Sequence, residues 1–244
     1  MNSNSNGKGV LISGGSRGIG RALCESFAKG GYKVAFIYKS NDKAAKEVES
    51  LTGALAIKAD VSISSEAVSA VKTAYDYLGS FDVLINNAGI SQIKLFTDTT
   101  DDDFQSIINT NLGGAFYLSR EIAKYMIREK RGAIINVGSM WGKCGASCEV
   151  TYSSSKAALR GMTMALAKEL GPSGITVNCI EPGLIRTEMN ASLDADTLRD
   201  ICDSTPLMRI GQPSDVAELA LFLASDSASF ITGQCIGVDG GFAV

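Results

Sequence analysis

Short apolar runs alternate with longer amphipathic stretches along almost the whole chain. Continuous apolar runs followed by helical periodicity are typical of a parallel sheet covered on both faces. Right-handed crossovers then favour an α/β, Rossmann-type doubly wound sheet in a single domain. Strands are predicted over 9–13, 34–38, 54–60, 82–89, 133–139, 175–183 and 234–241, and helices through Leu23, Phe27 and Ala28 and over 42–51, 66–78, roughly 101–128 and 150–170.

The two ends of the chain and one late segment depart from this alternation. Residues 1–7 are polar and are expected to be a frayed start, so the domain is predicted over 8–244. Residues 184–212 are the least regular stretch, with charges, Met and Pro. They are interpreted either as a lid over a ligand crevice or as a plain surface excursion.

Composition excludes several classes of function. The net charge is −3, which gives no reason to expect a nucleic acid or a membrane as partner. The chain has no histidine, so a Ser-His-Asp triad and a histidine metal cluster are excluded. The six cysteines are scattered, which favours a cytoplasmic chain with inert thiols. Cys144 and Cys148 lack partners for a four-ligand site, so no metal is predicted.

A glycine-rich loop follows the first predicted strand. Its glycines, Gly14, Gly18 and Gly20, allow a sharp turn and a close approach of the backbone to a pyrophosphate. The loop lies between a strand and a helix start, which is the context that a dinucleotide site requires.

The residues after the second strand bear on the choice of cofactor. NAD-binding units usually place a carboxylate there, whereas this chain has Tyr38, Lys39 and Ser40. Lys39, with Arg17 from the glycine loop, would attract a 2′-phosphate, so NADP(H) is favoured. The nearby Asp42 keeps NAD open.

Tyr152 and Lys156 are four positions apart in a predicted helix and therefore share a face. An ammonium about 4 Å from the phenol would favour phenolate by about 4 kcal/mol, or about 3 pKa units, with desolvation opposing part of the shift. The tyrosine is thus predicted to serve as the acid in place of histidine. Ser139, at the carboxyl end of a strand, is expected to donate to a substrate carbonyl. Asn111 is expected either to hold a relay water or to be a helix-packing amide.

These motifs together resemble the short-chain dehydrogenase/reductase family, and the resemblance covers essentially the whole chain. The quoted motifs are SGGSRGIG (13–20), Asp60-Val61, NNAG (86–89), Asn111, Ser139, YSSSK (152–156) and Pro182-Gly183. The resemblance implies a catalytic set of Ser139, Tyr152, Lys156 and Asn111. It implies a cofactor-binding set of Gly14, Ser16, Arg17, Gly18, Ile19, Gly20, Tyr38, Lys39, Ser40, Asp60, Val61, Asn87, Ala88, Gly89, Tyr152, Lys156, Pro182, Gly183, Ile185 and Thr187.

Within the family the chain looks most similar to the 3-oxoacyl-acyl-carrier-protein reductases. That resemblance implies a cytoplasmic homotetramer that uses NADPH, with an acyl carrier protein as partner. Of the two positions where relatives often dock the carrier through basic residues, Lys130 is kept and Ser173 is not basic.

The stretch between Ser139 and Tyr152 leaves other substrates open. It carries Trp141 and Glu149 as candidate substrate residues, and it is similar to reductases of 5-aminopentanone-modified elongation factor P. A carboxylate at Glu149 suits a substrate amine, although an acid is also favoured at a helix start. A hydroxysteroid or sugar dehydrogenase and a non-catalytic NADP(H)-sensing protein are further alternatives.

Overall fold

The structure is a computed structural model that describes residues 7–190 and 194–243. In this part of the chain, the predicted strands form one parallel sheet with the order β3-β2-β1-β4-β5-β6-β7. The strands are β1 (Gly9–Ser13), β2 (Lys33–Tyr38), β3 (Leu55–Lys58), β4 (Val83–Asn86), β5 (Gly132–Val137), β6 (Ile175–Pro182) and β7 (Cys235–Val238).

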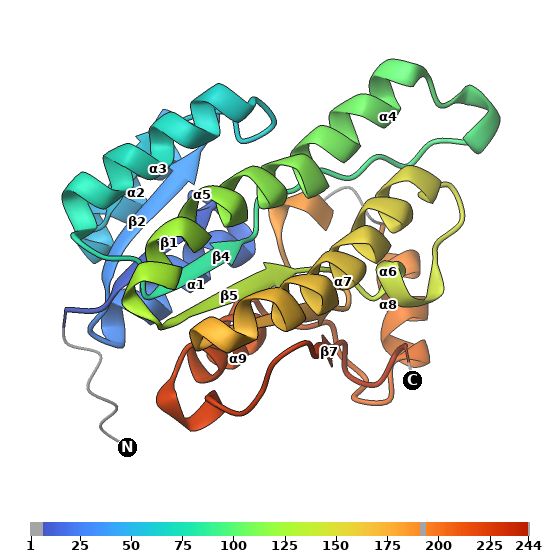
Figure 1. Ribbon diagram of the computed structural model, residues 1–244. Helices are drawn as coiled ribbons and strands as arrows, with labels where there is room; N and C mark the ends of the chain where they lie inside the picture. Colours follow the sequence, from blue (N-terminus) through green and yellow to red (C-terminus); the bar gives the residue numbers. More distant parts are fainter. Residues whose placement is uncertain (1–6, 191–193, 244) are drawn as a thin grey trace.

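Helices cover both faces of this sheet (Figure 1). They are α1 (Gly18–Lys29), α2 (Asp42–Thr52), α3 (Ser64–Leu78), α4 (Asp101–Ile108), α5 (Gly114–Glu129), α6 (Trp141–Cys144), α7 (Val150–Leu170), α8 (Ala195–Ser204) and α9 (Pro213–Leu223). The predicted doubly wound fold is therefore confirmed. No helix in the described part of the chain has both the length and the apolar character that a membrane span requires.

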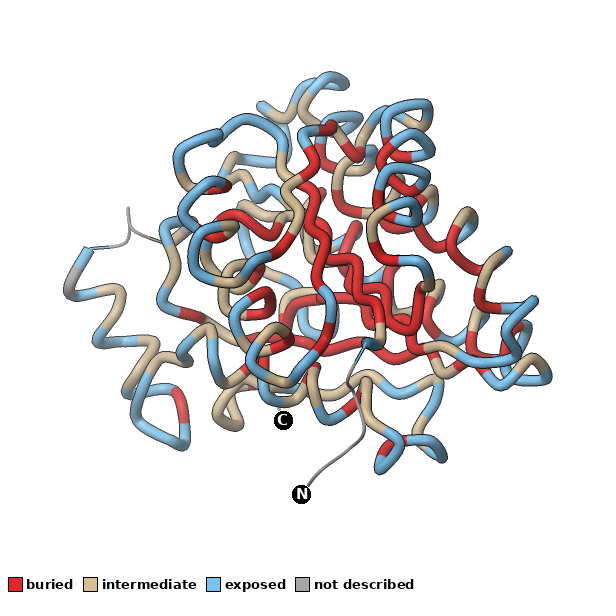
Figure 2. Tube along the Cα trace, turned by 90° about the vertical axis from the view of Figure 1, so that its left-hand side faces the viewer, coloured by how far each residue is buried: buried red, intermediate tan, exposed pale blue. Residues whose placement is uncertain are grey.

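The sheet separates two hydrophobic clusters because every residue of β1 is buried and successive side chains face opposite sides. Val10 and Ile12 pack with α1, α2 and α9, whereas Leu11 packs with α3, α5 and α7. Figure 2 shows the buried residues concentrated along the central strands. The strand order reverses between β1 and β4, and in such sheets ligands bind outside the carboxyl ends of the strands at this point.

The predicted long helix over 101–128 is present but interrupted. Residues Asn109–Gly113 form a π-helical turn that joins α4 to α5, and the two run on as one green rod in Figure 1. Such turns occur frequently at functional sites. Here the extra residue in the turn places Asn111 on the buried side, where it is 1% exposed.

The segment 184–212 is more regular than its composition indicates. It contains a 3-10 turn at Glu188–Asn190 and the helix α8, and residues 191–193 lie outside the described part. Its ends are tied together, because Gly211 donates to Leu184 O at 2.9 Å and Arg186 N donates to Gly211 O at 2.9 Å. The predicted frayed start also falls outside, except for the exposed Gly7. Neither α8 nor α9 was among the predicted helices.

Candidate active site

The glycine loop forms the tight turn that the sequence predicts. Gly14 has φ +69°, and a Cβ at Gly20 would lie 1.9 Å from Gly14 O. The amides of Gly14 and Gly15 both donate to Ile37 O, at 2.8 and 3.1 Å. Only glycine fits this close packing of the turn against the start of α1.

The start of α1 is open to an anion. Arg17 is the N-cap but makes no side-chain cap, and the first turn of α1 contains no acidic residue. The first N–H groups of a helix need partners, and the helix dipole adds positive potential. A Cβ at Gly18 would lie 3.3 Å from Thr187 Cγ2, so Thr187 borders this loop. The helix start has no side-chain cap, and the absence of a Cβ at Gly18 leaves room between the loop and Thr187. This arrangement fits the pyrophosphate of a dinucleotide.

Two cations, Lys39 and Arg17, are predicted to attract the 2′-phosphate of the cofactor, and each is paired with a carboxylate in the structure. The Lys39 ammonium pairs with Asp60 at 2.6 Å, and the Arg17 guanidinium pairs with Glu188 at 3.6 Å. Both cations are exposed. Asp42 is held by the Tyr38 hydroxyl at 3.0 Å and also by Lys58. Asp42, the carboxylate that left NAD as an alternative cofactor, is thus engaged by Tyr38 and Lys58, whereas the side chains of both cations are exposed to solvent.

Other predicted cofactor residues lie around the glycine loop and the ends of β4 and β6. Ser13 Oγ accepts from the amides of Asn87 and Ala88 at 3.0 Å each. Asn87 Nδ2 donates to Gly14 O at 3.1 Å, so the segment after β4 is fixed to the glycine loop. At β6, Pro182 O accepts from Met140 N at 3.0 Å. The remaining members are placed as follows: Ser16, Val61 and Ile185 are buried, Ile19 and Gly183 are partly buried, and Ser40 is exposed.

Three predicted catalytic side chains meet beyond the end of β5. Ser139 follows β5, and its hydroxyl interacts with the Tyr152 phenol. Lys156 lies one turn later on α7, is 4% exposed and has its Nζ 5.7 Å from the Tyr152 ring centroid. Lys156 Nζ donates to Val137 O at 2.8 Å, which fixes the ammonium beneath the tyrosine. The helical spacing therefore brings the pair together as expected.

The predicted acidification of Tyr152 is wrong for the protein without ligand. Burial raises the pKa of Tyr152 to about 12. The Glu149 carboxylate raises this pKa further, whereas the hydrogen bond with the Ser139 hydroxyl lowers it. Burial lowers the pKa of Lys156 to about 8. Desolvation is the largest influence on both groups and disfavours the charged form of each, and it outweighs the attraction that the spacing led us to expect. Tyr152 therefore holds its proton at neutral pH.

Asn111 connects the π turn to the rest of the site. Its amide exchanges two hydrogen bonds with the backbone of Ile90, at 2.8 and 3.0 Å, and Nδ2 also donates to Ser155 Oγ at 3.0 Å. A Cβ at Gly89 would lie 3.3 Å from Asn111 Oδ1 and 3.4 Å from Lys156 Nζ. The two polar groups therefore flank the same glycine. Ser155 was not among the predicted site residues, although its Oγ donates to Tyr152 O at 2.7 Å. Its position within the YSSSK motif was the one feature of the sequence that pointed to it.

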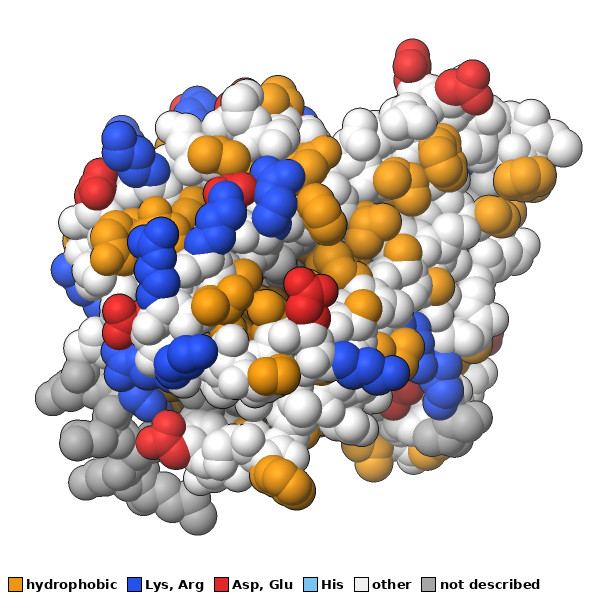
Figure 3. Space-filling model, in the orientation of Figure 1, with side chains coloured by type: hydrophobic (Ala, Val, Ile, Leu, Met, Phe, Trp, Pro, Cys, Tyr) orange, Lys and Arg blue, Asp and Glu red, His pale blue; other side chains and the backbone are white. Residues whose placement is uncertain are grey.

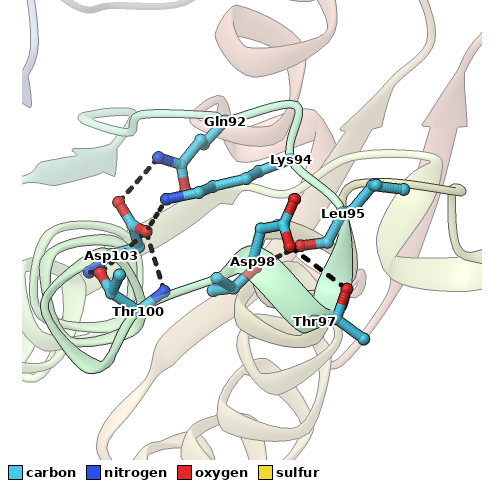
Figure 4. Close-up of polar contacts among 8 residues, drawn as sticks. Gln92, Lys94, Leu95, Thr97, Asp98, Thr100 and Asp103 are labelled. Carbon is cyan, nitrogen blue, oxygen red and sulfur yellow. Dashed lines mark hydrogen bonds and ion pairs between the residues drawn. The ribbon is translucent and has the colours of Figure 1, made fainter.

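An ion-pair network holds the loop after β4 against α4 (Figure 4). Asp103 accepts from Lys94 at 2.6 Å, Gln92 at 2.8 Å and Thr100 N at 2.9 Å. These donors, Lys94 first, hold the pKa of Asp103 well below its usual range. Lys94 N also donates to Cys148 O at 2.8 Å, so the loop is joined to the segment that precedes α7.

The predicted substrate residues lie on that preceding segment and beside a cavity. Trp141 packs edge-on against Phe242, with ring centroids 5.7 Å apart. Phe242 also lines a cavity of about 520 Å³ between the 184–212 segment and the residues after β7. Glu149 is partly buried, and burial raises the pKa of its carboxyl. Lys130 ends α5 at the amino end of β5, so it lies at the opposite end of that strand from Ser139.

Comparisons with known proteins agree with this architecture. A family model described as enoyl-(acyl carrier protein) reductase matches residues 14–243. The chain is 41% identical to an acetoacetyl-CoA reductase of Shinella zoogloeoides, covering 95% of this chain and 97% of the relative. It is 39% identical to a 3-oxoacyl-[acyl-carrier-protein] reductase FabG of Staphylococcus epidermidis, covering 96% and 98%.

Solved structures give the same result. A short-chain dehydrogenase/reductase mutant of Serratia marcescens is 33% identical with a TM-score of 0.92, over 98% of this chain and 99% of that chain. A putative gluconate dehydrogenase of Agrobacterium tumefaciens is 32% identical with a TM-score of 0.93, over 98% and 97%. The chain is therefore an oxidoreductase with a nicotinamide cofactor, and it belongs to the short-chain dehydrogenase/reductase family.

Proposed function

We propose that the protein is an NADPH-dependent reductase of 3-oxoacyl thioesters. The observation that carries the proposal is geometric: the Tyr152 phenol interacts with the Ser139 hydroxyl, and the buried Lys156 has its Nζ 5.7 Å from the Tyr152 ring centroid. The relatives named as acetoacetyl-CoA and 3-oxoacyl-acyl-carrier-protein reductases support the choice of substrate.

The mechanism follows from what these side chains hold. A bound NADPH would supply the hydride. The hydroxyls of Ser139 and Tyr152 donate to the ketone oxygen, and their hydrogen bonds strengthen as negative charge develops on it. Tyr152 then transfers its proton to that oxygen, and the buried Lys156 ammonium stabilises the phenolate that remains. A pKa of about 12 without ligand suits the acid of a reduction, since the group starts protonated.

The preference for NADPH rests on the cations at the glycine loop. Arg17 and Lys39 are exposed, and their carboxylate partners are surface groups from which a 2′-phosphate can recruit them. Replacing Lys39 by alanine should weaken NADPH binding at least several-fold and leave NADH binding nearly unchanged, as measured by nicotinamide fluorescence. Lys72→Ala on α3 is the control, and equal loss for both nucleotides contradicts the assignment.

An amino-ketone substrate is the second candidate, and Glu149 favours it. Its partly buried carboxylate has no hydrogen-bond or ion-pair partner among the described residues, and its charge acts on Tyr152. A substrate ammonium would supply that partner. The deciding experiment is a competition under NADPH between an acetoacetyl thioester and an amino ketone. Glu149→Gln should reduce the rate with the amino ketone far more than the rate with the thioester, and a thioester preference of the native protein rejects this candidate.

The role of Tyr152 is tested by Tyr152→Phe. Loss of a positioned acid typically costs about 10²–10⁴-fold in rate. We expect that loss in kcat, with NADPH affinity within a few-fold of the native value. Tyr77→Phe is the control, because the Tyr77 hydroxyl bonds Gly53 O at 3.1 Å on the surface of α3. A variant that keeps most of the native kcat refutes the mechanism, and a native protein inactive on every ketone favours an NADP(H)-sensing role.

The proposed enzyme is a cytoplasmic homotetramer, and a carrier protein is its proposed partner. Large apolar side chains exposed on α4 and α5, including Phe104 and Phe116, support self-association (Figure 3). Light scattering after size exclusion measures the mass, and a monomer rejects the tetramer.

A further inference from the structure

Strands β6 and β7 bring together two cysteines from distant parts of the chain. Cys179 and Cys235 are direct partners in the parallel register. Glu181 is two residues beyond Cys179 and therefore lies on the same face of β6. The two Sγ atoms and one carboxylate oxygen of Glu181 all lie within 4.8 Å of one another. These three residues have no role in the mechanism above.

The surroundings of this cluster are built around it. Cys179 is 0% exposed and Glu181 is 3% exposed, whereas Cys235 is partly exposed on the edge strand. A Cβ at Gly138 would lie 2.8 Å from Cys179 Sγ, so glycine leaves the space that the sulfur occupies. The Arg160 guanidinium donates to both carboxylate oxygens of Glu181. The cluster is thus packed, oriented and open to solvent on the Cys235 side.

We propose that Cys179, Cys235 and Glu181 bind one Zn²⁺ ion, with a water molecule as the fourth ligand. Two thiolates and a carboxylate are ligands that Zn²⁺ accepts in tetrahedral sites, and sulfur ligands select it over Mg²⁺ and Ca²⁺. Two thiolates, the carboxylate, Zn²⁺ and the Arg160 guanidinium sum to zero charge. Arg160 would hold the ligating carboxylate in place, as outer partners of metal ligands usually do.

The spacing of the strands favours a metal over a disulfide. Neighbouring strands lie about 4.7–4.9 Å apart. Zn–S bonds of about 2.3 Å in a tetrahedron place two sulfurs about 3.8 Å apart. A disulfide needs an S–S distance of about 2.05 Å and Cβ atoms about 3.8 Å apart. Directly opposed cysteines on parallel strands therefore reach the geometry of the metal site with less movement.

A bound ion would join the two strands that carry the walls of the cavity. The 184–212 segment begins after β6, and the cavity-lining residues Gly240 to Phe242 follow β7. Gly183 N already donates to Val238 O at 3.0 Å where both strands end. The ion would act as a clamp on this edge of the sheet and raise the melting temperature.

The test uses the full-length protein, freed of metal with a chelator and kept reduced. Titration with Zn²⁺ against a chromophoric chelator should give one ion per chain, and Cd²⁺ should give a thiolate charge-transfer band in the ultraviolet. Cys235→Ser should weaken Zn²⁺ binding more than about 100-fold, because even outer-shell partners are typically worth 10–100-fold. Cys144→Ser, which changes an exposed thiol outside the cluster, is the matched control and should bind Zn²⁺ normally.

A second measurement does not depend on any variant. Zn²⁺ should protect Cys235 of the native protein from alkylation, as mapped by mass spectrometry, and should leave the labelling of Cys144 unchanged. No stoichiometric binding, native affinity in Cys235→Ser, or equal protection of both thiols overturns the proposal. A Cys179–Cys235 disulfide in the purified, unreduced protein overturns it as well.

Discussion

The ion pair between Arg160 and Glu181 gives a sharp prediction about stability. The Glu181 side chain is 4% exposed and the Arg160 side chain is 29% exposed, so Arg160→Met leaves a buried carboxylate without its partner. Breaking a buried pair in this way costs about 3–5 kcal/mol. The partial exposure of Arg160 places the expected loss at the lower end, about 3 kcal/mol. For a chain of this size, that corresponds to a decrease in melting temperature of about 6–12 °C.

The assay is urea unfolding followed by circular dichroism, with a chelator present so that metal does not contribute. Glu181→Met and the double variant Arg160→Met/Glu181→Met complete a double-mutant cycle. The double variant should recover most of the loss, because replacing a buried pair by apolar groups is often neutral or stabilising. Arg120→Met is the control, since its partner Glu121 keeps Lys124 and the expected change is below about 1 kcal/mol. An Arg160→Met variant as stable as this control refutes the reasoning.

Three further predictions concern charge, packing and loop order. The pKa of Lys156 is lowered to about 8 in the folded protein, from about 10.4 in the unfolded chain, so the unfolded chain binds more protons between these pH values. The free energy of unfolding should therefore rise across about pH 8–10 by up to about 3 kcal/mol. A pH series of urea titrations measures this increase, and Lys156→Met should abolish it. Gly20→Ala should abolish NADPH binding because its Cβ would meet Gly14 O. Gly161→Ala on α7 is the control: its Cβ meets nothing within 4 Å, so this variant should be more stable by about 0.5–1 kcal/mol. A Gly20→Ala variant that binds NADPH normally contradicts the packing argument. Asp103→Ala should speed hydrogen exchange over residues 92–100 because Lys94 and Gln92 lose their common acceptor, and unchanged exchange would show that the network does not order this loop.

Local patterns were enough to predict most of the strands and the pairing of Tyr152 with Lys156 in the site. The apolar runs marked β1, β2, β4, β5 and β6 because strands buried on both faces are continuous in sequence. The four-residue spacing put Tyr152 and Lys156 on one face of α7, as found. The helices α8 and α9 escaped prediction, although Asp194 caps α8 and Gln212 with Asp215 forms a capping box for α9. Their start signals are polar residues that are equally common in loops.

The sequence by itself determined most of the strands, the longer helices and which residues share a face within an element, because these depend on periodicities of a few residues. The tertiary structure decided the protonation of Tyr152, since desolvation depends on atoms from Ser139, Glu149 and the surrounding elements together. It also decided that Asn111 turns inward through a π turn, and that Cys179 faces Cys235 across two strands. Burial and strand pairing join positions far apart in the chain, and no local pattern encodes them.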